Sequence, residues 1–252
     1  MKLRHLLSLV VGTLLLAALV GASGTASARS AACATGNGGY TYAGHQANRL
    51  GHGVRATITQ MQVPDVASGH VAGWVGVGGP GQGPNGTDEW IQVGVASVPG
   101  IPSFLYAEVT RPGRAPQLMI LEDEVVVGDS KRVAVLEMSR RAGWWRVWVD
   151  GSPATAPIRL RGSSGRWAPI ATAESWNGGD AVCNAFSFRF EQVSVSHGRG
   201  GSWFEFKPGY HFLDGNYKVR TLASAGGTDQ YTRRITGAGS GPDPYAFLAS
   251  SS

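Results

Sequence analysis

The chain has 252 residues, of which 37 are Gly and 13 are Pro, and only 15% are charged. This composition favours turns and extended segments, so it argues against an architecture of long surface helices. The formal net charge is +5; because the basic residues do not gather on one element, we expect no nucleic-acid partner.

The first 28 residues have the three-part layout of a secretory signal peptide. Lys2 and Arg4 precede an apolar stretch at residues 6–20, and small residues follow up to Ala28. The stretch is short for a membrane-spanning helix of about 20 residues, although an uncleaved anchor is the alternative. We therefore expect residues 1–28 to be removed, and the mature protein to be secreted, extracellular and free of the membrane.

Short segments separated by turn residues dominate the rest of the chain. Residues 29–53 are rich in Gly, Ala and small polar residues, which predicts a flexible N-terminal arm or short prosegment. Gly, Pro, Asn and Asp then separate alternating or apolar runs at residues 54–63, 70–77, 89–95, 103–110, 117–122, 131–138, 144–149, 158–160, 170–175 and 185–195. This spacing predicts one all-β domain over residues 54–198, a sandwich or a barrel.

The C-terminal part has a weaker pattern. We expect residues 199–222 to form a hairpin extension and residues 223–252 to be a flexible tail. The two cysteines, Cys33 and Cys183, are expected to form a disulfide in an oxidising compartment.

The run at residues 144–149 is rich in tryptophan. Its period of two puts Trp145 on one face of a strand and Trp144 and Trp148 on the other. Such a strand is either central and partly covered on its second face, or it lines an aromatic substrate cleft.

Common catalytic motifs such as H-E-x-x-H, G-x-S-x-G and the P-loop do not occur in the sequence. The six His residues lack metal-ligand spacing. We therefore expect neither a metal nor a cofactor.

The most distinctive motif is a pair of strands joined by a Pro- and Gly-rich loop. W-V-G-V at residues 74–77 is followed by I-Q-V-G-V at residues 91–95, which places Gln92 in mid-strand. A buried amide needs hydrogen-bond partners, and a bond across the sheet would suffice. The two segments also resemble the W-V-G-I and (L/I)-Q-x-G-V motifs of the eqolisins, the secreted, acid-acting glutamic peptidases of family G1.

This resemblance implies a concanavalin A-like sandwich of two antiparallel sheets, with a catalytic dyad of Gln92 and Glu174. Glu174 lies in A-E-S-W, 174 − 92 = 82 residues after Gln92. Trp74 and Trp90 would line the cleft, and Glu108 would be a supporting acid. The sequence departs from the family at Gly78, where Asp is usual, in the longer loop before Gln92, and after Glu108, where the family's Trp is missing.

The resemblance implies a polypeptide substrate, and we expect a monomer. Two other functions compete with this interpretation. One is a non-catalytic lectin-like module, with Trp74, Trp90, Trp144 and Trp148 stacking on sugar rings. The other is a glycoside hydrolase that pairs Glu174 with Glu89 or Glu108; in both cases the partner would be a polysaccharide. A close Gln92–Glu174 pair favours the peptidase, a carboxylate pair across the cleft favours the glycosidase, and neither arrangement favours the binding module.

Overall fold

The computed structural model describes residues 39–180, 182–214, 217–222 and 245–251. In these ranges the regular structure is almost entirely β, with one short 3-10 turn at Pro84–Gly86. No helix in the described part is long and apolar enough to cross a membrane. The strands are β1 (Tyr40–Ala47), β2 (Gly53–Gln60), β3 (His70–Gly79), β4 (Glu89–Ser97), β5 (Phe104–Thr110), β6 (Gln117–Glu122), β7 (Ser130–Glu137), β8 (Trp144–Val149), β9 (Ser152–Pro153), β10 (Ile158–Arg159), β11 (Ile170–Trp176), β12 (Ser187–Ser196), β13 (Trp203–Glu205), β14 (Pro208–Leu213), β15 (Tyr217–Thr221) and β16 (Tyr245–Ser251).

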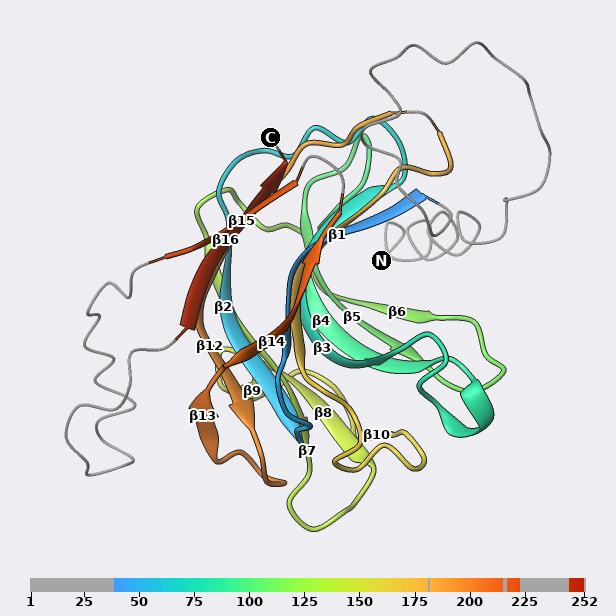
Figure 1. Ribbon diagram of the computed structural model, residues 1–252. Helices are drawn as coiled ribbons and strands as arrows, with labels where there is room; N and C mark the ends of the chain where they lie inside the picture. The colour runs from blue at the N-terminus through green and yellow to red at the C-terminus, as the bar shows by residue number, and fades with distance from the viewer. Residues whose placement is uncertain (1–38, 181, 215–216, 223–244, 252) are drawn as a thin grey trace.

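These strands form two antiparallel sheets that pack face to face (Figure 1). The seven-stranded sheet has the order β14-β1-β11-β3-β4-β5-β6. The nine-stranded sheet has the order β10-β8-β7-β2-β12-β16-β15, with β9 beside β8 and β13 beside β12. The predicted concanavalin A-like sandwich is therefore confirmed.

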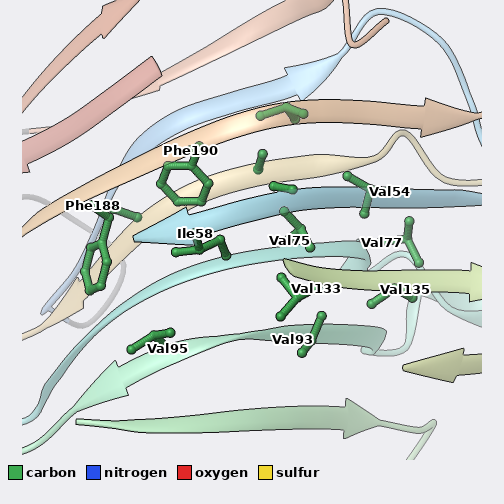
Figure 2. Close-up of a cluster of buried hydrophobic side chains, with 14 of the residues drawn as sticks. Val54, Ile58, Val75, Val77, Val93, Val95, Val133, Val135, Phe188 and Phe190 are labelled. Atoms are coloured by element: carbon green, nitrogen blue, oxygen red, sulfur yellow. The ribbon is translucent and has the colours of Figure 1, made fainter. Parts of the chain in front are cut away.

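The core lies between the two sheets and follows from the period-two alternation of the strands. Figure 2 shows its centre, where valines of β3, β4 and β7 meet Val54 and Ile58 of β2 and Phe188 and Phe190 of β12. Ile91, Val93 and Val95 of β4 point into this core, so the alternate set of β4 residues, which includes Gln92, faces away from it. The alternation thus fixes which side of the seven-stranded sheet carries polar chemistry.

The prediction of a flexible arm over residues 29–53 is wrong for residues 40–47. They form β1, which pairs with β11 on one side and β14 on the other. Its inward positions are Thr41, Ala43, His45 and Ala47, all buried. Because none of them is a large aliphatic residue, the hydrophobic alternation is too weak to show in the sequence.

The C-terminal predictions also need correction. Residues 199–222 do not form a single hairpin, because β14 joins the seven-stranded sheet while β15 joins the nine-stranded sheet. Residues 245–251, expected in the tail, form β16 between β12 and β15. The ring of Phe247 stacks on that of Phe190, with centroids 4.5 Å apart, so β16 contributes to the core.

Strand β8 lies in the nine-stranded sheet, away from the cleft described below. Trp145 is fully buried, whereas the Trp144 ring is covered by the guanidinium of Arg141 at 3.7 Å. The strand is therefore buried on one face and partly covered on the other, as the first interpretation states, but it is not central, because only the two-residue strands β9 and β10 lie beyond it in the sheet.

Several predictions concern residues outside the described ranges. They include the signal peptide at residues 1–28, residues 29–38 of the arm, residues 223–244 of the tail, and Cys33. The Cys33–Cys183 disulfide stays a prediction.

Candidate active site

A cleft of about 680 Å³ lies on the face of the seven-stranded sheet that points away from the core. Its lining is mostly aromatic and aliphatic. All five residues singled out from the sequence line it: Trp74, Trp90, Gln92, Glu108 and Glu174. The structure thus brings together side chains that come from β3, β4, β5 and β11.

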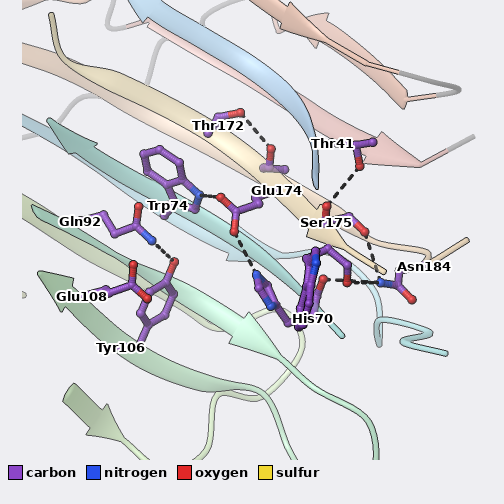
Figure 3. Close-up of polar contacts among 12 residues, drawn as sticks. Thr41, His70, Trp74, Gln92, Tyr106, Glu108, Thr172, Glu174, Ser175 and Asn184 are labelled. Atoms are coloured by element: carbon purple, nitrogen blue, oxygen red, sulfur yellow. Dashed lines mark hydrogen bonds and ion pairs between the residues drawn. The ribbon is translucent and has the colours of Figure 1, made fainter. Parts of the chain in front are cut away.

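Glu174 is held by donors on both carboxylate oxygens. His70 Nε2 lies 2.9 Å from Oε1, and Trp74 Nε1 donates to Oε2 at 3.3 Å. Tyr42, the neighbour of Glu174 on β1, also forms a hydrogen bond with this carboxylate. Figure 3 shows the contacts of Glu174 with His70 and Trp74. The Glu174 side chain nevertheless keeps 11% of its surface exposed, so water can reach it.

Gln92 is held by a different partner. Its Nε2 donates to the Tyr106 hydroxyl on β5 at 3.2 Å, which is the bond across the sheet that a buried amide requires. A primary amide has two N–H groups, and this bond uses one of them. Gln92 and Glu174 lie on either side of Trp74 (Figure 3). On β4, Gln92 comes two residues before the residue that pairs with Trp74. On β11, Glu174 comes two residues after the residue that pairs with Trp74.

Glu108 is the second carboxyl in the cleft. It sits directly opposite Gln92 on β5 and accepts a hydrogen bond from Trp90 Nε1 at 2.8 Å. Burial raises the pKa of Glu108; the Trp90 bond opposes this shift, and the negative charge of Glu174 adds to it. Glu108 therefore tends to keep its proton where an exposed carboxyl would lose it.

The tyrosines around Glu174 are neutral donors or acceptors. Burial raises the pKa of Tyr40, Tyr42 and Tyr106, and the negative charge of Glu174 raises each of them further. Their hydroxyl groups can therefore hydrogen-bond in the cleft without adding charge.

Two glycines shape the cleft floor. A Cβ at Gly94 would lie 2.6 Å from Trp74 Cβ, so glycine gives the Trp74 side chain room beside β4. Gly78, at the position where the eqolisin motif has Asp, has a φ of 85°. Glycine adopts this conformation without strain, so this departure from the motif has a local backbone reason.

His70, Tyr42 and Tyr106 are among the cleft residues that the sequence analysis missed. For two of them, the spacing of residues along a single strand could have indicated a place in the cleft. Residues at even spacing share a strand face, which places His70 beside Trp74 and Tyr106 beside Glu108. Tyr42 offered no such signal, because β1 was not recognised as a strand.

Several residues that the glycoside hydrolase and lectin-like alternatives require do not lie in the cleft. Glu89 is on the core side of β4 with 1% of its surface exposed, so it cannot pair with Glu174 in the cleft. Trp144 and Trp148 belong to the other sheet, and of the four tryptophans suggested for sugar stacking only Trp74 and Trp90 line the cleft. Among the described residues, no group of three or more His, Cys, Asp or Glu could hold a metal ion.

Comparisons with known proteins concern the fold. No protein-family model matches the chain, and no curated protein matches it. A structure of scytalido-glutamic peptidase with a transition state analog inhibitor has 12% identity and a TM-score of 0.48, covering 84% of this chain and 97% of that one. SCP-B, a member of the eqolisin family solved with the tripeptide Ala-Ile-His, has 15% identity and a TM-score of 0.45 over the same shares.

A sugar-degrading enzyme is also similar. The β-glucanase of Bacillus licheniformis has 13% identity and a TM-score of 0.34, covering 52% of this chain and 55% of that one. Such similarity does not distinguish peptide from carbohydrate chemistry, so the function has to follow from the side chains of the cleft.

Proposed function

We propose that the chain is a secreted, acid-acting endopeptidase in which Glu174 activates water and Gln92 stabilises the oxyanion. The observation that carries this proposal is the placement of Glu174 and Gln92 on either side of Trp74 in one cleft, each held by its own side-chain partners. Fixed orientation of this kind is what positioned acid–base and oxyanion groups require.

The reaction uses only side chains of this cleft and one water. Glu174 accepts a proton from the water while the water oxygen bonds to the peptide carbonyl carbon. The carbonyl π electrons move to its oxygen, and this oxyanion accepts a hydrogen bond from the N–H of Gln92 that Tyr106 leaves free. Glu174 then gives the proton to the peptide nitrogen, and the C–N bond breaks.

The apolar floor of the cleft favours a peptide over a polysaccharide. Ala72, Ala96, Phe104 and Ile170 pack there into a buried cluster that also includes Trp74 and Tyr106. This floor suits apolar side chains, whereas a sugar chain requires many hydrogen-bond partners for its hydroxyl groups.

The second candidate is a glycoside hydrolase that uses Glu108 and Glu174. One observation favours it: two carboxyls with unlike surroundings share the cleft. Glu108 is buried, has a raised pKa and suits a general acid, while Glu174 is contacted by the side chains of His70 and Trp74 and keeps part of its surface exposed. Such a difference is typical of carboxyl pairs in glycosidases.

The test is cleavage of an unfolded protein by the purified mature chain between about pH 2 and pH 7, beside Glu174→Gln and Gln92→Ala. Acid cleavage that is lost in both variants, with circular dichroism unchanged, supports the dyad. An active wild type whose cleavage survives either substitution contradicts it. Release of sugar from a glucan panel, abolished by Glu108→Gln, would instead establish the second candidate.

A further inference from the structure

We infer that a second binding surface lies on the outer face of the nine-stranded sheet, and that it binds an acidic polysaccharide whose sugars carry carboxylate groups. This surface, which we call the arginine–tryptophan patch, consists of Arg141, Trp144, Arg146, Trp148 and Arg159. It belongs to the sheet opposite to the one that carries the cleft. The inference is therefore independent of the proposed function.

The alternation of β8 puts the patch on the side of the sheet that faces solvent. Trp145 and Val147 are fully buried in the core, so the three members of the patch on β8 share the outer face. Arg159 of β10 is exposed and is the direct partner of Trp144 across the two strands. Arg141, in the turn before β8, is also exposed. Residues that are scattered in the sequence thus meet on one surface.

The ring of Trp144 holds two guanidinium groups in place. The guanidinium carbon of Arg141 lies 3.7 Å from the centre of this ring, and that of Arg159 lies 5.8 Å from it. A cation over an indole face is attracted by the ring electrons. A guanidinium that is stacked in this way still presents its N–H edge, which matches the plane of a carboxylate. The patch is therefore partly preorganised for carboxylate groups.

Within the described part of the chain, no acidic side chain forms an ion pair with an arginine of the patch. On the same sheet, Glu191 is paired with Arg189 at 3.2 Å, and Asp150 at the end of β8 accepts a hydrogen bond from the backbone N–H of Arg132. Glu205 is on β13, which pairs with β12 and not with β8. The patch is therefore a positive surface, and its charge is complementary to an anionic partner.

The spacing of the patch suits a polymer of acidic sugars. Arg146 is two residues from Trp144, or about 7 Å along the strand, and Arg159 lies on the neighbouring strand. Repeated carboxylates on one chain can bind both positions at the same time. The half-buried ring of Trp148 has no guanidinium of the described residues over it, so it offers apolar surface to the C–H face of a sugar ring.

Nucleic acid fits this patch less well than a polysaccharide does. Single strands are bound where several open aromatic rings follow a basic groove, and in the patch Arg141 covers the ring of Trp144. Duplex DNA is read by a helix or a ribbon that enters the major groove, whereas the patch is part of a sheet face. The observations therefore favour the acidic polysaccharide.

The experiment is isothermal titration calorimetry of the purified wild type with polygalacturonate, at about 50 mM and 200 mM salt. Dextran, dextran sulfate and single-stranded DNA are the comparison ligands. We expect polygalacturonate to bind more tightly than each of them. Its affinity should fall at the higher salt concentration, because exposed charges are screened.

Two double variants test the place of binding. Arg146→Gln with Arg159→Gln should lower the affinity for polygalacturonate about tenfold, or roughly threefold for each exposed ion pair, and should weaken its salt dependence. The matched control is Arg111→Gln with Arg114→Gln, which removes the same charge from the turn between β5 and β6 in the other sheet. The control should lose less than about twofold. Unchanged circular dichroism confirms that both variants fold.

Four results would overturn the inference. Polygalacturonate that does not bind removes the ligand, and equal losses in the two double variants mean that net charge alone is responsible. Tighter binding of dextran sulfate means that the surface responds to charge density and not to carboxylated sugars. Tighter binding of single-stranded DNA makes nucleic acid the partner. None of these measurements uses cleavage, so the proposed function can fail without affecting them.

Discussion

Two His–Glu pairs occur in the described part of this chain, and they differ in what surrounds the carboxylate. In the cleft, Glu174 is bound by His70 and Trp74 side chains and borders open space. Away from the cleft, Glu137 at the end of β7 is fully buried. There His52 Nδ1 lies 2.5 Å from Oε2, and the backbone N–H of Gly143 donates to Oε1 at 2.6 Å.

The comparison teaches that a His–Glu contact does not identify a site by itself. Glu137 binds His52, which precedes β2, and the backbone of Gly143, which precedes β8, and its side chain has no exposed surface for a reactant to reach. Glu174 uses donors that orient it toward a cavity. The first arrangement stabilises the fold, whereas the second is available for chemistry.

Replacing the carboxyl by an amide in each pair is expected to give the largest difference between the two pairs, in activity and in stability. Glu174→Gln is expected to lower kcat/KM by about 10³-fold, because a neutral amide cannot accept the proton from water. Its free energy of unfolding should change by less than about 1 kcal/mol. Glu137→Gln should lose roughly 2 kcal/mol of stability, since it weakens charge-assisted bonds in a buried place.

Urea denaturation and initial rates on one substrate measure both quantities. Glu137→Gln serves as the control for activity and Glu174→Gln as the control for stability. If Glu137→Gln stays stable and loses its activity, the distinction between the two pairs is wrong.

A histidine without a carboxylate sharpens the comparison. His45 on β1 is fully buried, with Nε2 at 2.9 Å from the Tyr245 hydroxyl on β16. Burial lowers the pKa of His45 to about 4, and the neighbouring His211 contributes to the shift. The folded chain therefore keeps His45 neutral in mild acid, whereas the unfolded chain protonates it.

This shift makes stability depend on pH. As the pH falls from about 6.5 to about 4, the unfolded state binds a proton that the folded state does not, so roughly 3 kcal/mol of stability is lost. Below the folded pKa the loss levels off. Urea denaturation at both pH values should show this loss in the wild type and a smaller one in His45→Gln; equal losses in the two proteins would argue against His45 as the cause.

Most of the sandwich was predictable because its strands carry a strong signal. The strands from β2 to β12 alternate large apolar and polar residues between Gly- and Pro-rich turns, so their positions follow from local patterns. β1 and β16 were not predicted as strands, and β14 and β15 were predicted as one hairpin, because the places of all four strands depend on distant partners. Tyr217, for example, pairs with Ser251 in the sheet opposite to that of β14.

The candidate site was predictable only in part. Gln92 and Glu174 came from the resemblance to eqolisin motifs, and the roles given to them remain proposals. The contact between His70 and Glu174 joins residues 104 positions apart. It depends on the register between β3 and β11, which no short motif specifies.

The smallest expected effect concerns the partner of Gln92. Tyr106→Phe removes the hydroxyl that accepts from Gln92 Nε2 but keeps the ring in the apolar floor. The Gln92 amide then loses one restraint worth about 1 kcal/mol, so kcat should fall by about fivefold with little change in KM. Tyr210→Phe, on an exposed tyrosine outside the cleft, is the matched control. A rise in KM with kcat unchanged would instead mean that Tyr106 binds substrate directly and does not act through Gln92.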